Sequence, residues 1–443
     1  MEIKRFYDEA LAHASYAITT GEELILVDPG RDPRQYLDYA AENGLTINSI
    51  LETHPHADFI SSHVEFATEH QATIFINPKA EPEYDYKPLD HEQTLTIGDI
   101  TFKALFTPGH SPDHNSYLLL DENDQPKAIF TGDALFIGDV GRPDLREGAG
   151  NQQVSKEELA EMMYDTVNDV FRPLPDDLQI YPAHGAGSLC GKNMSDELTS
   201  DLKQQKDNNW AFQIKDKGEF VKEFLNGQAF IPHYFPHDVK MNLEVIASFG
   251  AAVNDIPIVK KPLEDCIIVD CRSEEDFKKG HYDGAINIQY GEKAKFETWL
   301  GSLIKPDEDF CLVAGSFEEL QYAIQRVCKI GYERNCRGGI DYHDTGEQQE
   351  PLLDVDEFAN DTESYTIVDI RNQSEFEDGK FFEHAINIPL PELRERTDEV
   401  PTDKPIVVHC AGGYRSAAGS SILSKELPDA TVYDLSDDVE RFK

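Results

Sequence analysis

Histidine and aspartate residues cluster at four places in the first half of the chain, each directly after an apolar run. The four motifs are His54-Pro55-His56-Ala57-Asp58, Thr107-Pro108-Gly109-His110, Thr131-Gly132-Asp133 and Tyr181-Pro182-Ala183-His184. Imidazole and carboxylate groups bind transition metals, although a single short motif of this kind often matches by chance. Four such motifs in succession leave chance little room. The sequence therefore predicts one metal site built from several motifs.

A second candidate centre lies near the end of the chain, in the segment His409-Cys410-Ala411-Gly412-Gly413-Tyr414-Arg415-Ser416. An apolar run precedes this segment and an alanine-rich helix start follows it. A glycine-containing loop between a strand and a helix directs backbone N–H groups toward the cysteine sulfur and favours an anion there. We expect such a loop to favour the thiolate of Cys410, which is then available as a nucleophile. A buried structural cysteine would explain neither the glycines nor Arg415.

The elements around the metal motifs indicate an α/β fold, because short β-rich runs alternate with turn signals and helical stretches. We expect strands over Ala14 to Thr19, Glu23 to Val27, Ile47 to Leu51, Phe102 to Phe106, Ala128 to Thr131 and Leu178 to Tyr181. We expect helices over Pro33 to Asn43, Ser195 to Trp210 and Gly218 to Asn226. Polar residues that follow successive strands gather at one edge of a layered fold, so the four motifs should converge.

An internal repeat organises the remainder of the chain. The run from Ile267 to Arg272 leads to Ala285-Ile286-Asn287-Ile288, and the run from Thr366 to Arg371 leads to Ala385-Ile386-Asn387-Ile388. Each copy has the pattern of a strand, a helix and a second strand, as in small parallel α/β units. We therefore predict three domains, at residues 1-253, 254-349 and 350-443.

Composition and charge restrict the partners. The chain has 443 residues, of which 40% are hydrophobic, as in folded proteins of several domains. Its formal charge of -44 repels nucleic acids and anionic membranes, so any anionic substrate must meet local basic groups. No apolar run approaches the roughly 20 residues of a membrane span, and the seven cysteines lack the spacing of a disulfide framework. We expect a cytoplasmic protein with reduced thiols.

The first half of the chain resembles the metallo-β-lactamase superfamily, which implies an αββα sandwich with a metal at one edge of its two sheets. Members with two zinc ions normally have a histidine directly after the aspartate of the first motif, where this sequence has Phe59. His63 lies further along the chain, and its helical spacing from Asp58 leaves open whether it substitutes. A site that has lost this ligand suits a single ferrous ion with coordination positions free for dioxygen and a substrate sulfur.

The segment from Phe130 to Leu145 resembles the persulfide dioxygenases within this superfamily. The resemblance implies that His54, His110 and Asp133 are the iron ligands. By the same resemblance, three further residues lie nearby, where they orient the ligands and bind water: His56, Asp58 and His184. Of these, His56 is an alternative fourth ligand.

Two more residues are candidates for substrate contacts near the metal. Arg142 is expected to bind a carboxylate or phosphate on a thiol carrier, because guanidinium matches such anions in a bidentate fork. Arg146 has the same chemistry, with an ordinary surface arginine as the equal alternative. Cys190 either faces the metal pocket, where it would relay sulfur or gate access, or is a structural thiol.

The C-terminal copy of the repeat resembles rhodanese. By this resemblance Cys410 carries a persulfide sulfur, while Arg415 and the loop amides of Gly412, Gly413 and Tyr414 hold the anionic sulfur or thiosulfate. Cysteine phosphatases have a longer loop, so the short loop favours sulfur. The first copy resembles rhodanese at its opening strand, yet the segment from Leu312 to Glu318 has neither the cysteine nor the arginine, which predicts an inactive spacer.

The order of the three domains resembles the fused persulfide dioxygenases and rhodaneses, along essentially the whole chain. This resemblance implies one Fe(II) per chain, oxidation of a low-molecular-weight thiol persulfide by dioxygen to sulfite, and transfer of sulfane sulfur from Cys410 to sulfite to give thiosulfate. It also implies a role in sulfide detoxification and a homo-oligomer. The rival interpretations are a zinc thioester hydrolase of the glyoxalase II type and a sulfur carrier or sensor without catalysis.

Overall fold

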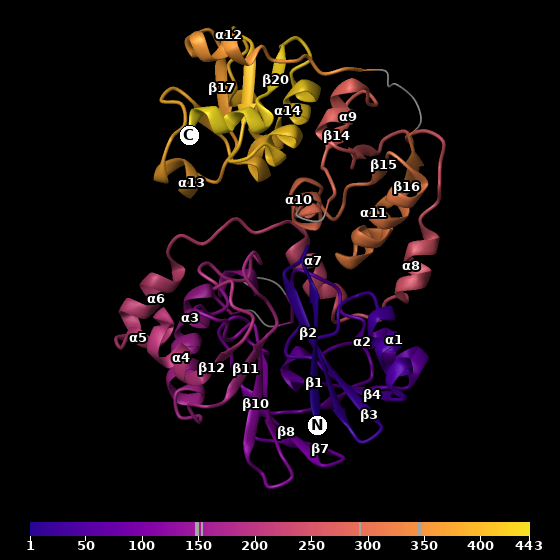
Figure 1. Cartoon of the computed structure of the whole chain (residues 1–443), viewed down its shortest axis with the longest axis vertical. Coiled ribbons are helices and arrows are strands. Elements are labelled where there is room, and N and C mark those ends of the chain that lie inside the picture. The colour runs from indigo at the N-terminus through magenta and orange to yellow at the C-terminus, as the bar shows by residue number, and fades with distance from the viewer. Residues whose placement is uncertain (147–149, 152–153, 292–293, 343–347) are drawn as a thin grey trace. The chain divides into compact units, whose positions relative to one another are not determined.

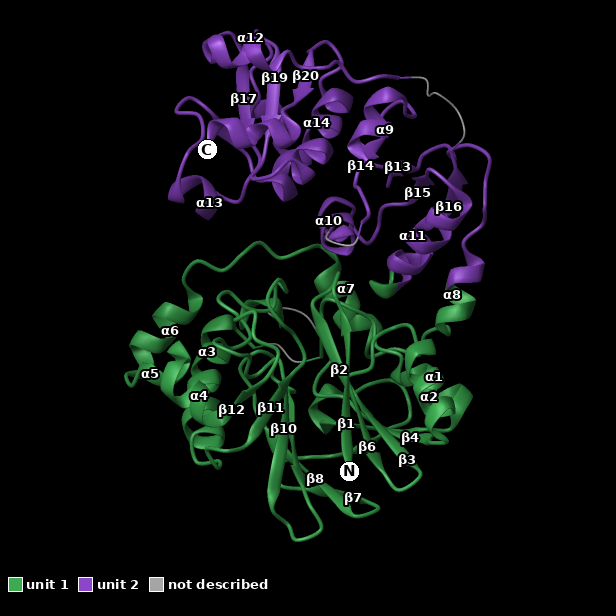
Figure 2. Cartoon of the chain, viewed as in Figure 1, with its two compact units in different colours: residues 1–252, 329–331 green, residues 253–328, 332–443 purple. Residues whose placement is uncertain are grey.

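The computed structural model describes residues 1–146, 150–151, 154–291, 294–342 and 348–443. These residues form two compact units (Figure 2). The first unit comprises Met1–Ala252 with Lys329–Gly331, and the second comprises Val253–Cys328 with Tyr332–Lys443. The two copies of the internal repeat thus belong to one compact unit. Among the described residues, no helix combines the length and the apolar character needed to cross a bilayer.

Two six-stranded sheets form the first unit (Figure 1). The first sheet contains, in spatial order, β1 (Glu2–Asp8), β2 (His13–Thr20), β3 (Glu23–Val27), β4 (Thr46–Leu51), β5 (Thr73–Ile76) and β6 (Lys87–Pro88). The second contains β12 (Ser200–Asp201), β11 (Gln179–Pro182), β10 (Pro126–Gly132), β9 (Asn115–Leu120), β8 (Ile100–Phe106) and β7 (Thr94–Ile97). All six strands predicted from the sequence are therefore present, with bounds that differ by at most two residues.

Helices cover the outer faces of both sheets, which makes the unit an αββα sandwich. Figure 1 shows α1 (Arg34–Asn43) and α2 (His63–His70) beside the first sheet. Beside the second sheet lie α3 (Lys156–Asp165), α4 (Leu202–Asn208), α5 (Trp210–Gln213) and α6 (Lys217–Leu225). The chain then continues through α7 (Tyr234–Met241) and α8 (Phe249–Asp255).

The alternating pattern of β2 explains why the sheets stack. Tyr16 and Ile18 point into the layer between the two sheets, where Phe102 and Phe130 of the second sheet meet them. Ala17, one position away, lies in the cluster that joins the first sheet to α1 and α2. Successive side chains of a strand point to opposite faces, so a strand that is buried on both faces can contribute to two cores at once.

Two four-stranded parallel sheets form the second unit. The first has the order β14 (Ile286–Asn287), β13 (Ile267–Asp270), β15 (Phe310–Ala314), β16 (Cys336–Asp341), with α9 (Glu274–Lys279), α10 (Phe296–Leu303) and α11 (Phe317–Lys329). The second has the order β18 (Ile386–Asn387), β17 (Thr366–Asp369), β19 (Ile406–His409), β20 (Val432–Asp434), with α12 (Val355–Asn360), α13 (Gln373–Asp378) and α14 (Tyr414–Glu426). The strand, helix and strand pattern predicted for each copy is confirmed.

Two parts of the first unit differ from the sequence-based expectation. The predicted helix from Ser195 to Trp210 is wrong over its first part, because the chain forms β12 and α4 begins only at Leu202. The side chain of Asp201 accepts a hydrogen bond from the Gln204 amide and caps the helix there. The sequence also does not predict β1, whose charged residues alternate along an edge strand paired with β2.

Candidate metal centre and cysteine loop

The four polar motifs converge at one edge of the first unit, as predicted from their places after β4, β8, β10 and β11. One potential ligand atom from each of His54, His110 and Asp133 lies within 4.8 Å of the others. A second group of this kind contains His56, Asp133 and His184, and a third contains Asp58, His184 and Cys190. All of these residues are buried. The sequence-based site residues of the first unit, apart from Arg142, thus form one continuous cluster.

The three residues expected to hold iron present unpaired atoms to a common point. His110 Nε2 lies 3.6 Å from Asp133 Oδ2, and His54 Nε2 lies 3.9 Å from the same oxygen. Neither Asp133 Oδ2 nor His54 Nε2 has a hydrogen-bond partner, although both are buried. A buried polar atom without a partner is costly, whereas a cation at this point would satisfy both atoms. The donor set of two imidazoles and one carboxylate therefore fits a ferrous ion.

Hydrogen bonds to Nδ1 of His54 and of His110 hold each imidazole in the tautomer that can bind a metal through Nε2. The Thr53 hydroxyl donates to Asp28 Oδ2 at 2.9 Å, so it accepts from His54 Nδ1, 3.0 Å away. Similarly, His110 Nδ1 donates to the backbone oxygen of Arg142 at 2.9 Å. In both rings Nε2 is then the nitrogen with the free lone pair.

His184 lies between two carboxylates. Its Nδ1 is 2.8 Å from Asp133 Oδ1, and its Nε2 is 3.0 Å from Asp58 Oδ2. Burial alone would lower the pKa of His184, but the two carboxylates raise it well above its usual value. Burial raises the pKa of Asp133 in turn, yet His184 and His110 lower it well below its usual range. The hydrogen bond at Nδ1 orients Asp133, whereas Nε2 faces Asp58 without a hydrogen bond of good geometry.

Phe59 fills the place where a further histidine would be expected. Its side chain is fully buried, and its ring centroid lies 4.4 Å from that of His56 and 3.8 Å from that of His13. His63 does not substitute for it, because His63 Nδ1 lies 3.6 Å from Glu52 Oε1 and its ring packs against Tyr84. Burial lowers the pKa of His63 to about 3, so its imidazole is neutral.

Several buried residues near the metal centre are not among the sequence-based candidates. His114 Nε2 accepts a hydrogen bond from the Asp133 amide at 3.1 Å, and Asp28 Oδ1 lies 3.3 Å from His56 Nε2. Asp28 directly follows β3, as the four motifs follow their own strands, so its place at a strand end was the available signal. For His114 the sequence offers only its proximity to His110.

Arg142 and Arg146 are buried and already paired within the fold. Arg142 donates to both oxygens of Asp144, at 2.7 and 2.6 Å, and to the backbone oxygen of Ala229 at 2.6 Å. Arg146 donates to both oxygens of Asp113, at 3.2 and 2.9 Å. The role predicted for Arg142 in binding a substrate anion stays a prediction, and it requires these bonds to be replaced.

Cys190 lies at the metal centre, since its sulfur belongs to the group with Asp58 and His184. Burial raises the pKa of its thiol well above the usual value, and the charges of Asp58 and Asp133 raise it further. Without a cation nearby, Cys190 is therefore a protonated thiol and not a thiolate nucleophile.

The cysteine loop of the second unit joins β19 to α14. Cys410 is buried, and Arg415 donates to both oxygens of Glu375, at 2.7 and 2.8 Å. Residues of the first repeat copy contribute to this site, because the Tyr414 hydroxyl donates to the Gln289 backbone oxygen at 2.7 Å. The Arg415 guanidinium lies 5.8 Å from the ring of Trp299, which also belongs to the first copy.

The corresponding loop of the first copy is closed by its own carboxylate. The Gly315 amide donates to Glu319 Oε2 at 3.0 Å, so a negative side chain occupies a position where an anion would be bound. Cys271 and Cys311 are buried in the core, and burial raises the pKa of the Cys271 thiol well above the usual value. These observations agree with the expected lack of activity in this copy.

Comparison with known proteins assigns both halves. Residues 8–184 match the metallo-beta-lactamase superfamily, and residues 256–341 and 354–443 match the rhodanese-like domain. A crystal structure of a metallo-beta-lactamase from Staphylococcus aureus subsp. aureus COL is 32% identical, covers 77% of this chain and 98% of that chain, and superposes with a TM-score of 0.67.

Several curated relatives match less than half of the chain. The probable metallo-hydrolase YqgX of Bacillus subtilis (strain 168) is 28% identical over 191 residues, which are 39% of this chain and 84% of the relative. A hydroxyacylglutathione hydrolase of Pseudoalteromonas translucida (strain TAC 125) is 32% identical over 188 residues, or 41% of this chain and 63% of the relative. The chain belongs to the metallo-β-lactamase superfamily and carries rhodanese-like domains after its metallo-β-lactamase domain.

Proposed function

We propose that the first unit is a non-haem Fe(II) persulfide dioxygenase and that the C-terminal rhodanese-like domain is a sulfurtransferase that uses the resulting sulfite. The observation that carries this proposal is Phe59, which places an apolar ring beside His56 where a ligand of a second metal would be expected, while His54, His110 and Asp133 still form a group that can hold one cation. A lone cation in such a site suits oxygen chemistry better than the hydrolytic chemistry of paired zinc ions.

A bound ferrous ion with three protein ligands supplies open positions where dioxygen and a substrate sulfur meet. The residues of the chain prepare this site. Thr53 and the Arg142 backbone fix the two imidazoles, and His184 holds Asp133 Oδ1 so that Oδ2 stays free. In the overall reaction, a thiol persulfide, dioxygen and water give the free thiol, sulfite and two protons.

The sulfurtransferase step needs only the chemistry of Cys410. Its thiolate attacks the outer sulfur of a second persulfide molecule, whose sulfur–sulfur bond breaks to release the carrier thiolate. A sulfite lone pair then attacks the outer sulfur now bound to Cys410, and the Cys410 thiolate leaves as thiosulfate forms. Arg415 is the cation of the loop that can bind these anions, and its bonds to Glu375 would then have to be replaced. Fusion of the two activities keeps sulfite close to its acceptor site.

A zinc thioester hydrolase of the glyoxalase II type is the second candidate for the first unit. The similarity to hydroxyacylglutathione hydrolases favours it. Phe59 opposes it, because this residue removes a ligand position from a two-zinc centre. The rhodanese-like domains also have no evident use in thioester hydrolysis.

The experiment that separates these functions loads the full chain anaerobically with Fe(II) or with Zn(II). The iron form should consume one dioxygen for each sulfite released from glutathione persulfide, and Cys410→Ser should release sulfite but form no thiosulfate. Hydrolysis of a glutathione thioester by the zinc form, with no oxygen uptake by either form, would favour the hydrolase.

A further inference from the structure

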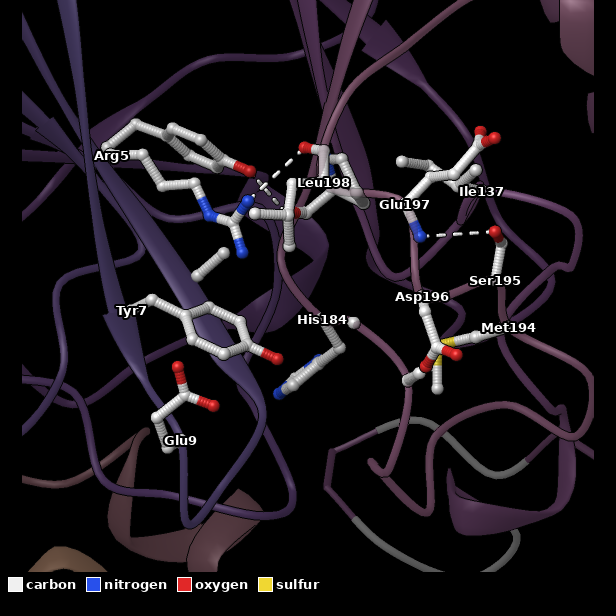
Figure 3. Close-up of a pocket in the computed structure, with 15 residues that line it drawn as sticks. Arg5, Tyr7, Glu9, Ile137, His184, Met194, Ser195, Asp196, Glu197 and Leu198 are labelled. Atoms are coloured by element: carbon white, nitrogen blue, oxygen red, sulfur yellow. Dashed lines mark hydrogen bonds between the residues drawn. The ribbon is translucent and has the colours of Figure 1, made fainter.

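A cavity of about 450 Å³ opens beside the metal centre (Figure 3). His184 lies at its base, and Arg5, Tyr7 and Glu9 of β1 and the turn after it form one wall. The opposite wall is the irregular segment from Met194 to Leu198. His184 also contacts Asp58 and Asp133, so the cavity borders the candidate metal centre at this residue. Its volume lies within the range of small-molecule sites.

Arg5 is the one arginine or lysine among the described residues that line the cavity. Its guanidinium stacks on the Tyr7 ring at 4.5 Å, and its Nη1 donates to the Leu198 backbone oxygen at 3.2 Å. Its Nε is buried and has no hydrogen-bond partner. A guanidinium that is held in place but keeps a free donor is prepared to bind a carboxylate in a charge-assisted pair.

Apart from Arg5 and the His184 imidazole at the base, the charged side chains around the cavity are carboxylates. Glu9 lies on the wall with Arg5, and Asp196 and Glu197 lie on the opposite wall. A single arginine among three carboxylates does not suit a polyanion, and the chain's formal charge of -44 repels a polyanion further. A ligand with both a carboxylate and an ammonium group can pair its carboxylate with Arg5 and its ammonium group with the carboxylates of the cavity.

The lack of a side chain at Gly185 allows close packing at the cavity wall. A Cβ at this position would lie 2.9 Å from the Tyr7 hydroxyl, so the missing side chain lets Tyr7 approach the loop that carries His184. The Tyr7 hydroxyl and the His184 imidazole therefore line the same end of the cavity (Figure 3).

We infer that this cavity binds the amino-acid portion of a zwitterionic thiol persulfide, with Arg5 holding its carboxylate. This inference rests on the proposed dioxygenase function, whose substrate class it narrows. Carriers of the cysteine or glutathione type carry both groups, whereas phosphate-rich carriers of the coenzyme A type do not match the charges. Arg5 is thus a specificity-determining residue, and the persulfide end of the ligand lies toward His184.

The test compares Arg5→Ala and Arg5→Lys with Arg34→Ala, which removes an exposed arginine from α1 as the matched control. For the iron-loaded full chain, the KM for glutathione persulfide should rise at least about tenfold in Arg5→Ala, as expected for loss of one charge-assisted pair. It should rise less in Arg5→Lys and remain unchanged in Arg34→Ala. The KM for the persulfide of 2-mercaptoethanol, a carrier with neither a carboxylate nor an ammonium group, should not change in any of them.

A second measurement separates this inference from the reaction itself. S-methylglutathione, which has no reactive sulfur, should bind the wild type and the Arg34→Ala protein by calorimetry and bind Arg5→Ala at least about tenfold more weakly. This holds whether or not oxygen is consumed. Equal binding by Arg5→Ala, or displacement of S-methylglutathione by coenzyme A at equal concentration, would overturn the inference even if persulfide oxidation is confirmed.

Discussion

Replacing Gly413 by alanine is expected to disable the cysteine loop and leave the metal centre intact. Gly413 has a φ of 88°, in the left-handed region. A Cβ built at this position would lie 2.4 Å from Asp437 Oδ1 and 2.8 Å from the Asp437 backbone nitrogen. Contacts this short force either the loop or the segment around Asp437 to move.

The magnitude follows from these two features. An alanine in the left-handed conformation costs about 1–2 kcal/mol, and overpacking against the backbone adds about 1–3 kcal/mol. The domain should therefore melt at a lower temperature and keep its fold. A displacement of about 1 Å in the loop after Cys410 is enough to slow a positioned group transfer about a hundredfold.

The assay measures thiosulfate formed from sulfite and a persulfide, together with sulfite formed from the same persulfide. Gly379→Ala is the matched control in the same domain, because Gly379 has an extended φ of 174° and a Cβ there would have no neighbour within 4 Å. Only Gly413→Ala should lose thiosulfate formation, and both variants should release sulfite as the wild type does. Thiosulfate formation by Gly413→Ala at the wild-type rate, or an equal loss of thiosulfate formation in Gly379→Ala, would refute the reasoning.

Three further changes test other parts of the account. Phe59→His should raise bound zinc from one toward two ions per chain, measured by elemental analysis, and an unchanged content would show that Phe59 does not decide the number of metals. Gly141→Ala should abolish iron binding, because a Cβ there would lie 2.0 Å from the Asp133 backbone oxygen; normal iron content would contradict this. Burial, and after it the interaction with Glu274, raises the pKa of Asp434 to about 7. The stability that the protonated Asp434 carboxyl contributes should therefore be lost as the pH rises from roughly 4 to 8. Denaturant titrations should show that Asp434→Asn removes this dependence, and an identical pH profile would count against it.

The convergence of the candidate metal ligands could be predicted from the sequence, because strand ends bring distant residues together. Each of His54, His110 and Asp133 follows its own apolar strand, and the layered fold places these strand ends at one edge. The two copies of the repeat could also be predicted, because buried parallel strands such as β13 and β17 are short apolar runs in the sequence.

Other features could not be predicted, because they depend on contacts between distant segments. Arg142 has the residue type of an anion-binding group, but Asp144 and backbone oxygens near Ala229 occupy its donors. Arg5 lies in a charged N-terminal segment without a strand signal, and only pairing of β1 with β2 brings it to the cavity. Glu319 closes the inactive loop from the next helical turn, which sequence spacing alone does not reveal.

The central claim is that one redox-active metal at the edge of the two sheets oxidises persulfide sulfur. The most direct measurement combines metal analysis of the natively purified chain with oxygen uptake and sulfite release on addition of glutathione persulfide. The account predicts one iron per chain and one dioxygen consumed for each sulfite. A pair of zinc ions in each chain, with no oxygen uptake from any persulfide after iron loading, would contradict it.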